Sequence, residues 1–313
     1  MKNLEERGHL LTEQVNPNSH NLDQLSSLEL VELFNQEDEL AIAAVAAAKT
    51  ELAKAIARTA EALRHGGRLF YVGAGTSGRL GVLDAAECPP TFCTPPELVQ
   101  GIIAGGAAAL VRSSEDLEDR AEDGDAAIAQ RHITQLDVVV GITAGGTTPF
   151  VHGALEAARQ RGATTIFIAC VPAEQVSAHT DIDIRLLVGP EVLAGSTRLK
   201  AGTATKLALN ILSTGVMVQL GKVYGNRMVD VAVTNNKLRD RALRILQDLT
   251  GLEREAAGYL LERSNLKVKL ALMMHWTGLE AEEGDRLLAE HKGNLRAAVS
   301  SHNHSSATLT QLQ

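Results

Sequence analysis

Hydrophobic and polar positions follow two different patterns along the chain, and the change between them marks where the predicted fold changes from helices alone to alternating strands and helices. Over residues 37–65 apolar residues recur at helical spacing, and Gly66-Gly67 follows as a typical helix stop. Ser26-Ser27 predicts the cap of a shorter helix over 28–35. From Leu69 onward, short apolar runs alternate with helical segments. This alternation is typical of an α/β fold whose parallel sheet is covered by helices on both faces.

Four runs have the length and composition of strands, and they are followed by helical segments. The predicted strands span 69–72, 138–142, 164–169 and 182–188, and the predicted helices include one from about Pro149 and a long apolar one over 200–222. A strand-like run over 228–233 then precedes four or five short helices between 235 and 300, separated by Gly251, Asn265, Gly278 and Gly293. The polar tail 300–313 is predicted to be loose.

These patterns divide the chain into three parts. Residues 1–58 form an N-terminal arm with helices, 59–222 form the α/β domain, and 223–313 form a small helical (UBA-like) module with the tail. The domain of 59–222 carries the glycine-rich turns, so we expect the ligand there.

Composition and charge limit the classes of molecule that the protein is expected to bind. The net charge is −8 and aromatic residues make up 3%, which argues against nucleic acid and against base-stacking surfaces. Cys88, Cys93 and Cys170 lack metal-ligand spacing and are expected to be buried thiols, and His302 and His304 are expected to be solvated. No stretch has the pattern of a signal peptide or a membrane span, so we expect a cytoplasmic protein with no metal and no membrane partner.

The turn Gly73-Ala74-Gly75-Thr76-Ser77-Gly78 follows a strand, opens a helix and fits the dinucleotide-binding pattern. That pattern also needs an acidic residue at the end of a second strand about 20 positions later. The corresponding region, 88–96, holds four prolines and cannot be a central strand. The sequence therefore does not support dinucleotide binding.

The same turn suits a phosphate monoester. Hydroxyl side chains and free backbone N–H groups at a helix N-terminus bind phosphate together. A second loop, 143–148, follows the strand at 138–142, and two such loops at one edge of a parallel sheet can close around a ligand. The candidate binding residues are Gly75, Thr76, Ser77 and Gly78 in the first loop, and Thr147 and Thr148 in the second.

Carboxylates are the candidate acids and bases. Glu87 ends an apolar helical segment before Cys88-Pro89-Pro90, at the helix end where a negative charge is disfavoured, which suits a general acid. Glu115, Asp116, Glu118 and Asp119 form a second group, and spacing alone does not single out one of the four. Such a group is more often a solvated helix start than a catalytic site.

Several long motifs resemble the N-acetylmuramic acid 6-phosphate etherases, a family in the sugar isomerase (SIS) fold group that is related to the glucokinase regulatory protein. The similarity lies in YVGAGTSGRLG at 71–81, DAAECPPTF at 84–92, TEQ and NPN at 12–14 and 16–18, GPEVLAGSTRLK at 189–200, and 231–238. The resemblance implies a three-layer α-β-α SIS domain. It also implies cleavage of the D-lactyl ether of N-acetylmuramic acid 6-phosphate to N-acetylglucosamine 6-phosphate and D-lactate, in cell-wall sugar recycling.

The resemblance also implies site residues. By motif position the acid is Glu87 and the second catalytic glutamate is Glu118, expected as the base, while Ser196 and Lys200 join the residues that bind the phosphosugar. In the second loop relatives have a serine near Gly145, which leaves Thr147 and Thr148 as hydroxyl donors here. No cofactor is implied. An aldose–ketose isomerase and a non-catalytic phosphosugar sensor are the rival functions.

A helix that runs unbroken from Ser77 to Glu87 separates their backbones by roughly 15 Å. That span is long for one sugar phosphate. Either this helix is shorter, or Glu87 serves a site that a second subunit completes, and we expect a homodimer with a shared active site.

Overall fold

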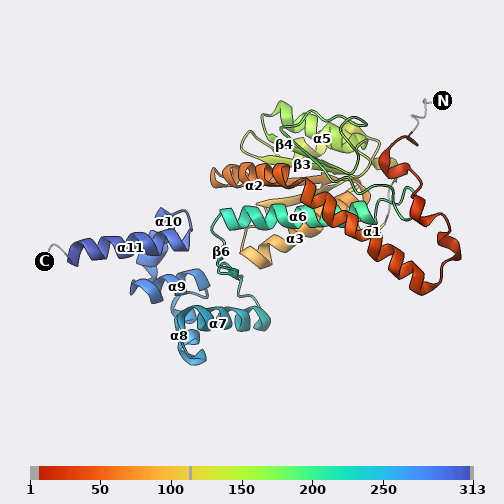
Figure 1. The fold of residues 1–313 in the computed structure, drawn as a ribbon. Helices are drawn as coiled ribbons and strands as arrows, with labels where there is room; N and C mark the ends of the chain where they lie inside the picture. The colour runs from red at the N-terminus through yellow and green to blue at the C-terminus, as the bar shows by residue number, and fades with distance from the viewer. Residues whose placement is uncertain (1–6, 113–114, 311–313) are drawn as a thin grey trace. The chain divides into compact units, whose positions relative to one another are not determined.

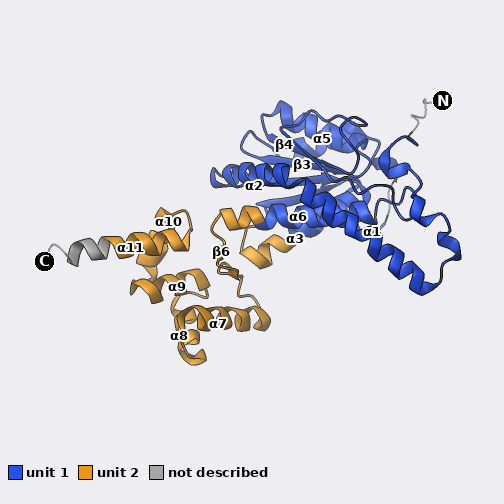
Figure 2. Ribbon diagram, in the orientation of Figure 1, with its two compact units in different colours: residues 1–86, 96–214 blue, residues 87–95, 215–313 orange. Residues whose placement is uncertain are grey.

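The computed structural model describes residues 7–112 and 115–310, which form two compact units (Figure 2). The first contains residues 1–86 and 96–214, and the second contains 87–95 and 215–313. Residues 7–58 thus lie in the same unit as the sheet. The C-terminal part of the second unit begins at Gly215, eight residues before the predicted module at 223, and residues 87–95 of α3 (Gly75–Phe92) and the segment after it join this unit.

The first unit is built on a five-stranded parallel sheet of order β2-β1-β3-β4-β5. Its strands are β1 (Leu69–Gly73), β2 (Val99–Ile103), β3 (Val138–Thr143), β4 (Thr164–Ala169) and β5 (Ile182–Arg185). The predictions for β1, β3 and β4 are confirmed, whereas β5 is shorter than expected and β2 was not predicted. The glycine in β2, Gly101, explains the weak signal: a Cβ there would lie 2.6 Å from Val82, so the helix above requires a residue that lowers strand propensity.

Helices cover both faces of this sheet (Figure 1). Every residue of β1, β3 and β4 is buried, as the continuous apolar runs predicted. One face packs on α5, where Phe70, Val139 and Phe167 join a core with Val151 and Leu155. The opposite face packs on α3, whose Gly81 lies directly over Tyr71. The helices of this unit are α1 (Ser27–Ala47), α2 (Lys49–Arg64), α3 (Gly75–Phe92), α4 (Ala121–Gln130), α5 (Pro149–Gln160) and α6 (Lys200–Gln219), of which α3 and α6 continue into the second unit.

The N-terminal helices differ from the prediction in where the chain breaks. Ser26 caps α1 through a capping box with Glu29, as expected from its hydroxyl. The helix then continues past residue 35 and breaks only at Ala48. The predicted interruption does not occur because Glu37 is buried and paired in the interior of α1, so this polar position is part of the core.

The second unit is helical. Four or five helices were predicted here, and five are present among the described residues. The final one is longer than expected, because the tail predicted to be loose continues α11 as far as Thr310. The helices are α7 (Asn236–Thr250), α8 (Arg254–Arg263), α9 (Val268–Thr277), α10 (Ala281–Glu290) and α11 (Leu295–Thr310), and the predicted strand over 228–233 is reduced to a two-residue ladder of β6 (Val223–Tyr224) with β7 (Arg227–Met228). Residues 311–313 lie outside the described residues.

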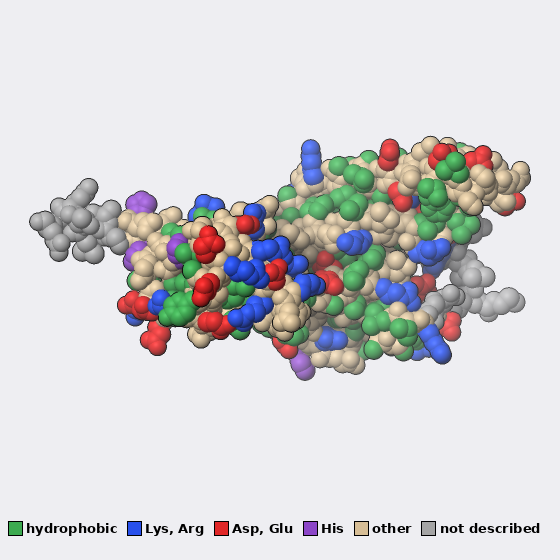
Figure 3. Space-filling view, turned by 90° about the horizontal axis from the view of Figure 1, so that it is seen from below, with side chains coloured by type: hydrophobic (Ala, Val, Ile, Leu, Met, Phe, Trp, Pro, Cys, Tyr) green, Lys and Arg blue, Asp and Glu red, His purple; other side chains and the backbone are tan. Residues whose placement is uncertain are grey.

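Among the described residues, no helix combines the length and the apolar character that crossing a bilayer requires. On the face of the molecule drawn in Figure 3, acidic and basic side chains are interspersed with exposed hydrophobic ones. Exposed hydrophobic residues also lie on α1, where Leu28, Val31 and Ile42 are each more than half exposed.

Candidate functional site

The two glycine-rich loops meet because their strands are neighbours in the sheet. β1 and β3 pair directly, with Gly73 opposite Ile142, although their first residues lie 69 positions apart along the chain. Strand order reverses at this point, with β2 on one side and β4 on the other. In open α/β sheets, ligands bind at the carboxyl ends of the strands at such a switch point.

A polar cavity of about 290 Å³ lies at this edge of the sheet. It brings together six of the ten residues that the sequence analysis singled out. These are Gly75, Thr76, Ser77, Thr147, Thr148 and Glu118. The rest of the lining comes from Arg7, Leu10 and Glu13, from Ala74, Thr143, Ala144 and Gly145, and from Gly195 and Thr197.

The conformation of each loop presents its polar groups to the cavity. Gly75 has φ +52° at the start of α3, and Thr76 and Ser77 follow in the first turn, where backbone N–H groups have no partner within the helix. In the second loop the Thr148 hydroxyl lies 2.8 Å from the Thr143 hydroxyl. Gly146 has φ +80°, and its carbonyl lies 2.6 Å from Nε2 of His152 on α5.

Glu118 reaches the same cavity from the segment between β2 and α4. Its carbonyl oxygen accepts a hydrogen bond of 3.0 Å from the N–H of Phe150, in the first turn of α5. This bond holds Glu118 beside the second loop. Of the four clustered acids, Glu118 is the one that lines this cavity among the described residues.

Lys200 is a correction to the predicted site. Its side chain is 1% exposed, and its ammonium forms an ion pair with Glu37, at 2.5 Å from Oε2. The amide groups of Lys200 and Ala201 donate to the Glu191 carboxylate, so the N-terminus of α6 is already occupied. Burial raises the pKa of Glu191 despite these bonds. Lys200 is therefore a structural residue, and it does not line the cavity.

Ser196 and Gly78 also lie outside the cavity lining. Ser196 is partly buried between Gly195 and Thr197, which do line it. Gly78 is buried at the contact between α3 and the sheet, and its N–H donates to the carbonyl of Ala74. The glycine signal at 78 thus reflects close packing of a helix on strands.

Gly78→Ala is expected to destabilise the first unit. A Cβ at residue 78 would lie 2.6 Å from Ile103 Cγ1 and 2.7 Å from the Gly73 oxygen, so α3 would have to shift. Overpacking of this kind costs about 1–3 kcal/mol. Urea unfolding measures the loss, with Gly8→Ala, which meets nothing within 4 Å, as control. Equal unfolding midpoints for the two variants would contradict the packing role.

Glu87 is exposed, and the helix that carries it is longer than predicted. α3 continues for five residues past Glu87 and includes Pro89 and Pro90, which were expected to stop it. The prolines remove hydrogen bonds only in the last turns of the helix, and Cys93 N–H still bonds the Pro89 carbonyl at 2.9 Å. The dipole argument for Glu87 is therefore weakened, because it is not at the end of the helix. Glu87 is not among the residues that line the cavity.

Two segments line the cavity with residues that were not predicted to belong to the site. One is the N-terminal arm with Arg7, Leu10 and Glu13, and the other is the loop with Gly195 and Thr197. The motifs TEQ at 12–14 and GPEVLAGSTRLK at 189–200 were the available signals. These motifs have no hydrophobic periodicity, so the sequence pattern did not predict where they lie in the fold.

The described residues show no group of three or more His, Cys, Asp or Glu side chains that could hold a metal ion. Cys88 and Cys170 are buried as expected, and burial raises the pKa of Cys170 to about 12, which keeps its thiol protonated. Cys93, in contrast to the prediction, is exposed.

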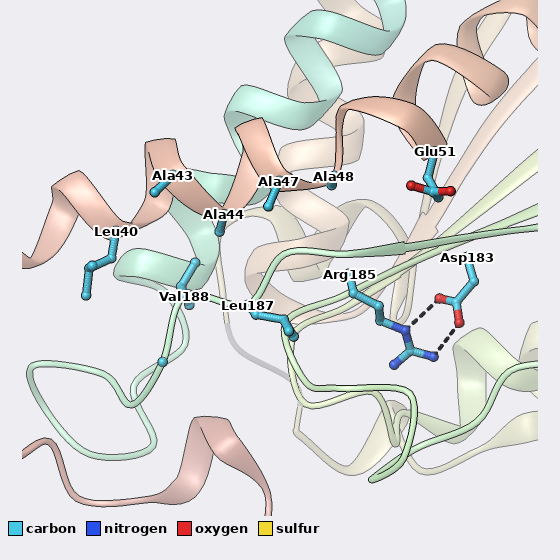
Figure 4. A pocket seen from close by; sticks show the side chains of 11 residues that line it. Leu40, Ala43, Ala44, Ala47, Ala48, Glu51, Asp183, Arg185, Leu187 and Val188 are labelled. Carbon is cyan, nitrogen blue, oxygen red and sulfur yellow. Dashed lines mark hydrogen bonds and ion pairs between the residues drawn. The ribbon is translucent and has the colours of Figure 1, made fainter.

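A larger cavity, of about 680 Å³, lies between α1 and the segment around β5 (Figure 4). Leucine and alanine side chains form most of its lining. The Arg185 guanidinium there is bound by Asp183 at 2.6 and 2.8 Å and by the carbonyls of Val171 and Val176. This cavity lacks the hydroxyl groups and helix N-terminus found at the sheet edge, and it is a weaker candidate for a phosphosugar.

Three family models match the chain. They are the glucokinase regulatory protein N-terminal SIS domain over residues 51–159, the SIS domain over 120–215, and the C-terminal lid domain of glucokinase regulatory protein over 225–291. The SIS matches, together with the parallel sheet, confirm the predicted fold class.

Relatives match over almost the whole chain. The N-acetylmuramic acid 6-phosphate etherase of Nostoc punctiforme is 84% identical over 305 residues, which cover 97% of this chain and 99% of that protein. The enzyme of the same name from Trichormus variabilis is 83% identical over 302 residues, or 96% and 98% of the two chains. Among solved structures, a phosphoheptose isomerase from Francisella tularensis matches at 18% identity and a TM-score of 0.47, over 62% of this chain and 100% of that one.

Proposed function

Because the chain belongs to the N-acetylmuramic acid 6-phosphate etherase family, as its motifs predicted, we propose that it cleaves the D-lactyl ether of N-acetylmuramic acid 6-phosphate. The products are N-acetylglucosamine 6-phosphate and D-lactate. One observation carries the proposal: two hydroxyl-rich loops and Glu118 line the same cavity. We place the reaction in the cytoplasm, in the recycling of cell-wall sugars.

The loops suit the phosphate end of the substrate. Thr76 and Ser77 combine two hydroxyl donors with the N-terminus of an 18-residue helix, where the helix dipole favours an anion. Thr147 and Thr148 supply hydroxyls from the neighbouring loop. A phosphate anchored there fixes the sugar chain relative to Glu118, and such positioning lowers the entropic part of the barrier.

The chemistry then requires two proton transfers. When the sugar ring is open, C1 is an aldehyde and the C2 proton is acidic. Glu118 removes that proton, the C3–oxygen bond breaks, and the departing lactate oxygen takes a proton from Glu87. Water adds to C3 of the unsaturated aldehyde and a proton returns to C2, which restores both glutamates. Each well-placed proton transfer contributes roughly 10²–10⁴-fold.

We infer that Glu87 reaches this chemistry in a homodimer, where it serves the cavity of the partner subunit. Two observations support the inference. α3 runs unbroken from the phosphate loop past Glu87, so ten residues, or roughly 15 Å of helix, separate Ser77 from Glu87. Exposed hydrophobic side chains on α1 provide apolar surface of the kind that protein interfaces cover.

Mixing two inactive variants tests the shared site. Glu87→Gln and Glu118→Gln are each expected to be inactive, but after co-refolding half of the dimers carry one of each. If the two glutamates of a site come from different subunits, one site in each mixed dimer is complete, and about one quarter of wild-type activity returns. If both come from one chain, every site of a mixed dimer is defective, and no recovery would rule out sharing.

A D-lactate assay on the purified chain with N-acetylmuramic acid 6-phosphate tests the function itself. Release of D-lactate in step with N-acetylglucosamine 6-phosphate is expected. Interconversion of the sugar phosphate without lactate would identify an isomerase instead, and binding without turnover would identify a phosphosugar sensor.

A further inference from the structure

Glu13 places a second carboxylate in the cavity that contains Glu118. It ends the short 3-10 helix Leu11–Glu13 of the N-terminal arm. The proposed reaction assigns no role to it. Its charge is not needed for the phosphate loops, which bind an anion, so its presence in this cavity requires another explanation.

The arm holds Glu13 in place from both sides. Leu10 and Thr12 are 2% and 0% exposed, and Leu10 belongs to the core of the sheet together with Phe70 and Val72. The N–H of Glu13 donates to the Leu10 carbonyl at 2.9 Å. Three residues later, the Asn16 amide donates to Glu37 at 2.7 Å. Glu13 is itself exposed, and the buried residues on either side position its backbone at the cavity.

The Glu13 carboxylate faces the loop that forms the opposite wall. A Cβ added to Gly195 would lie 3.1 Å from Glu13 Oε2, closer than ordinary contact. Gly195 also has φ +74°, a conformation that favours glycine. Asn16 ties the same two walls together, since its amide also donates to the Pro190 carbonyl at 3.1 Å. Glu13 thus lies where the arm meets the loop that contributes Thr197 to the cavity.

A carboxylate at this position has a definite chemical preference. An ionised carboxylate only accepts hydrogen bonds, so it binds hydroxyl and amide N–H groups and repels phosphate and other carboxylates. The phosphosugar carries groups of both kinds at different places along its length. The cavity matches this distribution, with hydroxyl donors and a helix N-terminus at the loops and an acceptor at Glu13.

We propose that Glu13 is a specificity-determining residue that accepts a hydrogen bond from a hydroxyl or amide group of the sugar and directs the phosphate toward the two loops. The proposal rests on the proposed function for the identity of the sugar. It assigns no proton transfer to Glu13. Loss of the residue therefore affects sugar binding more than the chemical step.

The test is calorimetric binding of two ligands to Glu13→Ala and Glu13→Gln. N-Acetylglucosamine 6-phosphate carries the sugar groups, whereas inorganic phosphate probes the loops alone. A hydrogen bond to a charged group contributes enough that Glu13→Ala should weaken sugar-phosphate binding roughly 10- to 100-fold. Glu13→Gln keeps an acceptor without the charge and should fall between Ala and wild type. Phosphate affinity should stay the same or rise in both variants, because a negative charge has been removed.

Kinetics provide a second readout, in which KM for the ether substrate should rise by a similar factor while kcat changes much less. Gln14→Ala is the matched control, since Gln14 is the exposed neighbour in the same arm and does not line the cavity. It should bind both ligands as wild type does.

Wild-type affinity for the sugar phosphate in Glu13→Ala would overturn the proposal. Equal weakening of both ligands would do so too, because it would mean that the arm supports the loops rather than contacts the sugar. If Glu13→Ala does not fold, Glu13→Gln alone decides between these outcomes. Failure of the proposed function is a separate result: wild-type protein would then release no lactate, while its binding of the two ligands would still test Glu13.

Discussion

Glu118→Gln is expected to reduce D-lactate release by roughly 10²–10⁴-fold while leaving the fold intact. Gln has nearly the same shape as Glu but cannot take a proton. The Glu118 backbone is held by its bond from the Phe150 N–H, which the substitution does not touch. The variant should therefore keep its unfolding midpoint and bind N-acetylglucosamine 6-phosphate within a few-fold of wild type.

Solvent exchange in deuterated water separates the base from the acid. If Glu118 removes the C2 proton, Glu118→Gln should show neither exchange at C2 nor lactate release. Glu87→Gln should still exchange at C2 and release no lactate, because only protonation of the leaving group is lost. Asp119→Asn, an exposed neighbour outside the cavity lining, is the control. Near-normal lactate release by Glu118→Gln would remove Glu118 from the mechanism.

Glu37→Gln is expected to lower the free energy of unfolding by roughly 3–5 kcal/mol, since it leaves the buried Lys200 ammonium without its counter-ion. Both side chains are at most 4% exposed. Glu37 also accepts hydrogen bonds from Asn16 and Asn18, so the same substitution loosens the arm that carries Glu13. Urea unfolding at pH 7 measures the effect.

The pH dependence of this difference has a defined direction. Burial opposes ionisation of Glu37, but hydrogen bonds from Lys200, Asn18 and Asn16 outweigh it and lower the pKa of its carboxyl. A lowered folded-state pKa gives stability that is complete above the unfolded value, about 4.3, and is lost as the pH falls through the folded value. The gap between wild type and Glu37→Gln should thus be widest near neutral pH and shrink in acid.

A double substitution distinguishes loss of the ion pair from loss of shape. Glu37→Gln with Lys200→Met removes both charges. The double variant should be more stable than the sum of the two single changes predicts, because each single change leaves one buried charge unpaired and the double change leaves none. Additive losses, or a change below about 1 kcal/mol for Glu37→Gln, would show that the pair contributes little to the fold.

Sequence patterns predicted the elements whose burial is uniform. β1, β3 and β4 are buried on both faces, so their continuous apolar runs identified them without any partner information. β2 was missed because it is an edge strand with a glycine that α3 requires. That two glycine- and hydroxyl-rich loops follow β1 and β3 was also predictable, since such residues after a strand are a local signal, and we propose that these loops bind phosphate.

The remaining parts of the candidate site depend on long-range contacts, which local patterns do not encode. Lys200 was expected to bind substrate because it ends the family motif GPEVLAGSTRLK at 189–200. Its partner, Glu37, lies 163 positions away, and only the folded chain brings them together. Glu118 could not be separated from its acidic neighbours by spacing, and only the family motif selected it. Glu13 lies in the family motif TEQ, but no local pattern marked it as a cavity residue, since the arm becomes a cavity wall through Leu10 and Asn16.

Because of the strand order, the proposed phosphate-binding residues and the proposed base lie on different kinds of segment. In the proposed site the phosphate binds to the turns after β1 and β3, which are paired strands inside the sheet. Glu118 instead lies on the connection that leaves β2, at the edge of the sheet, and returns to α4. Mutation of that connection can therefore change or abolish the reaction while the hold on phosphorylated sugars persists. We therefore expect substitutions in this one peripheral crossover to be enough to separate catalysis from sugar-phosphate binding on this fold.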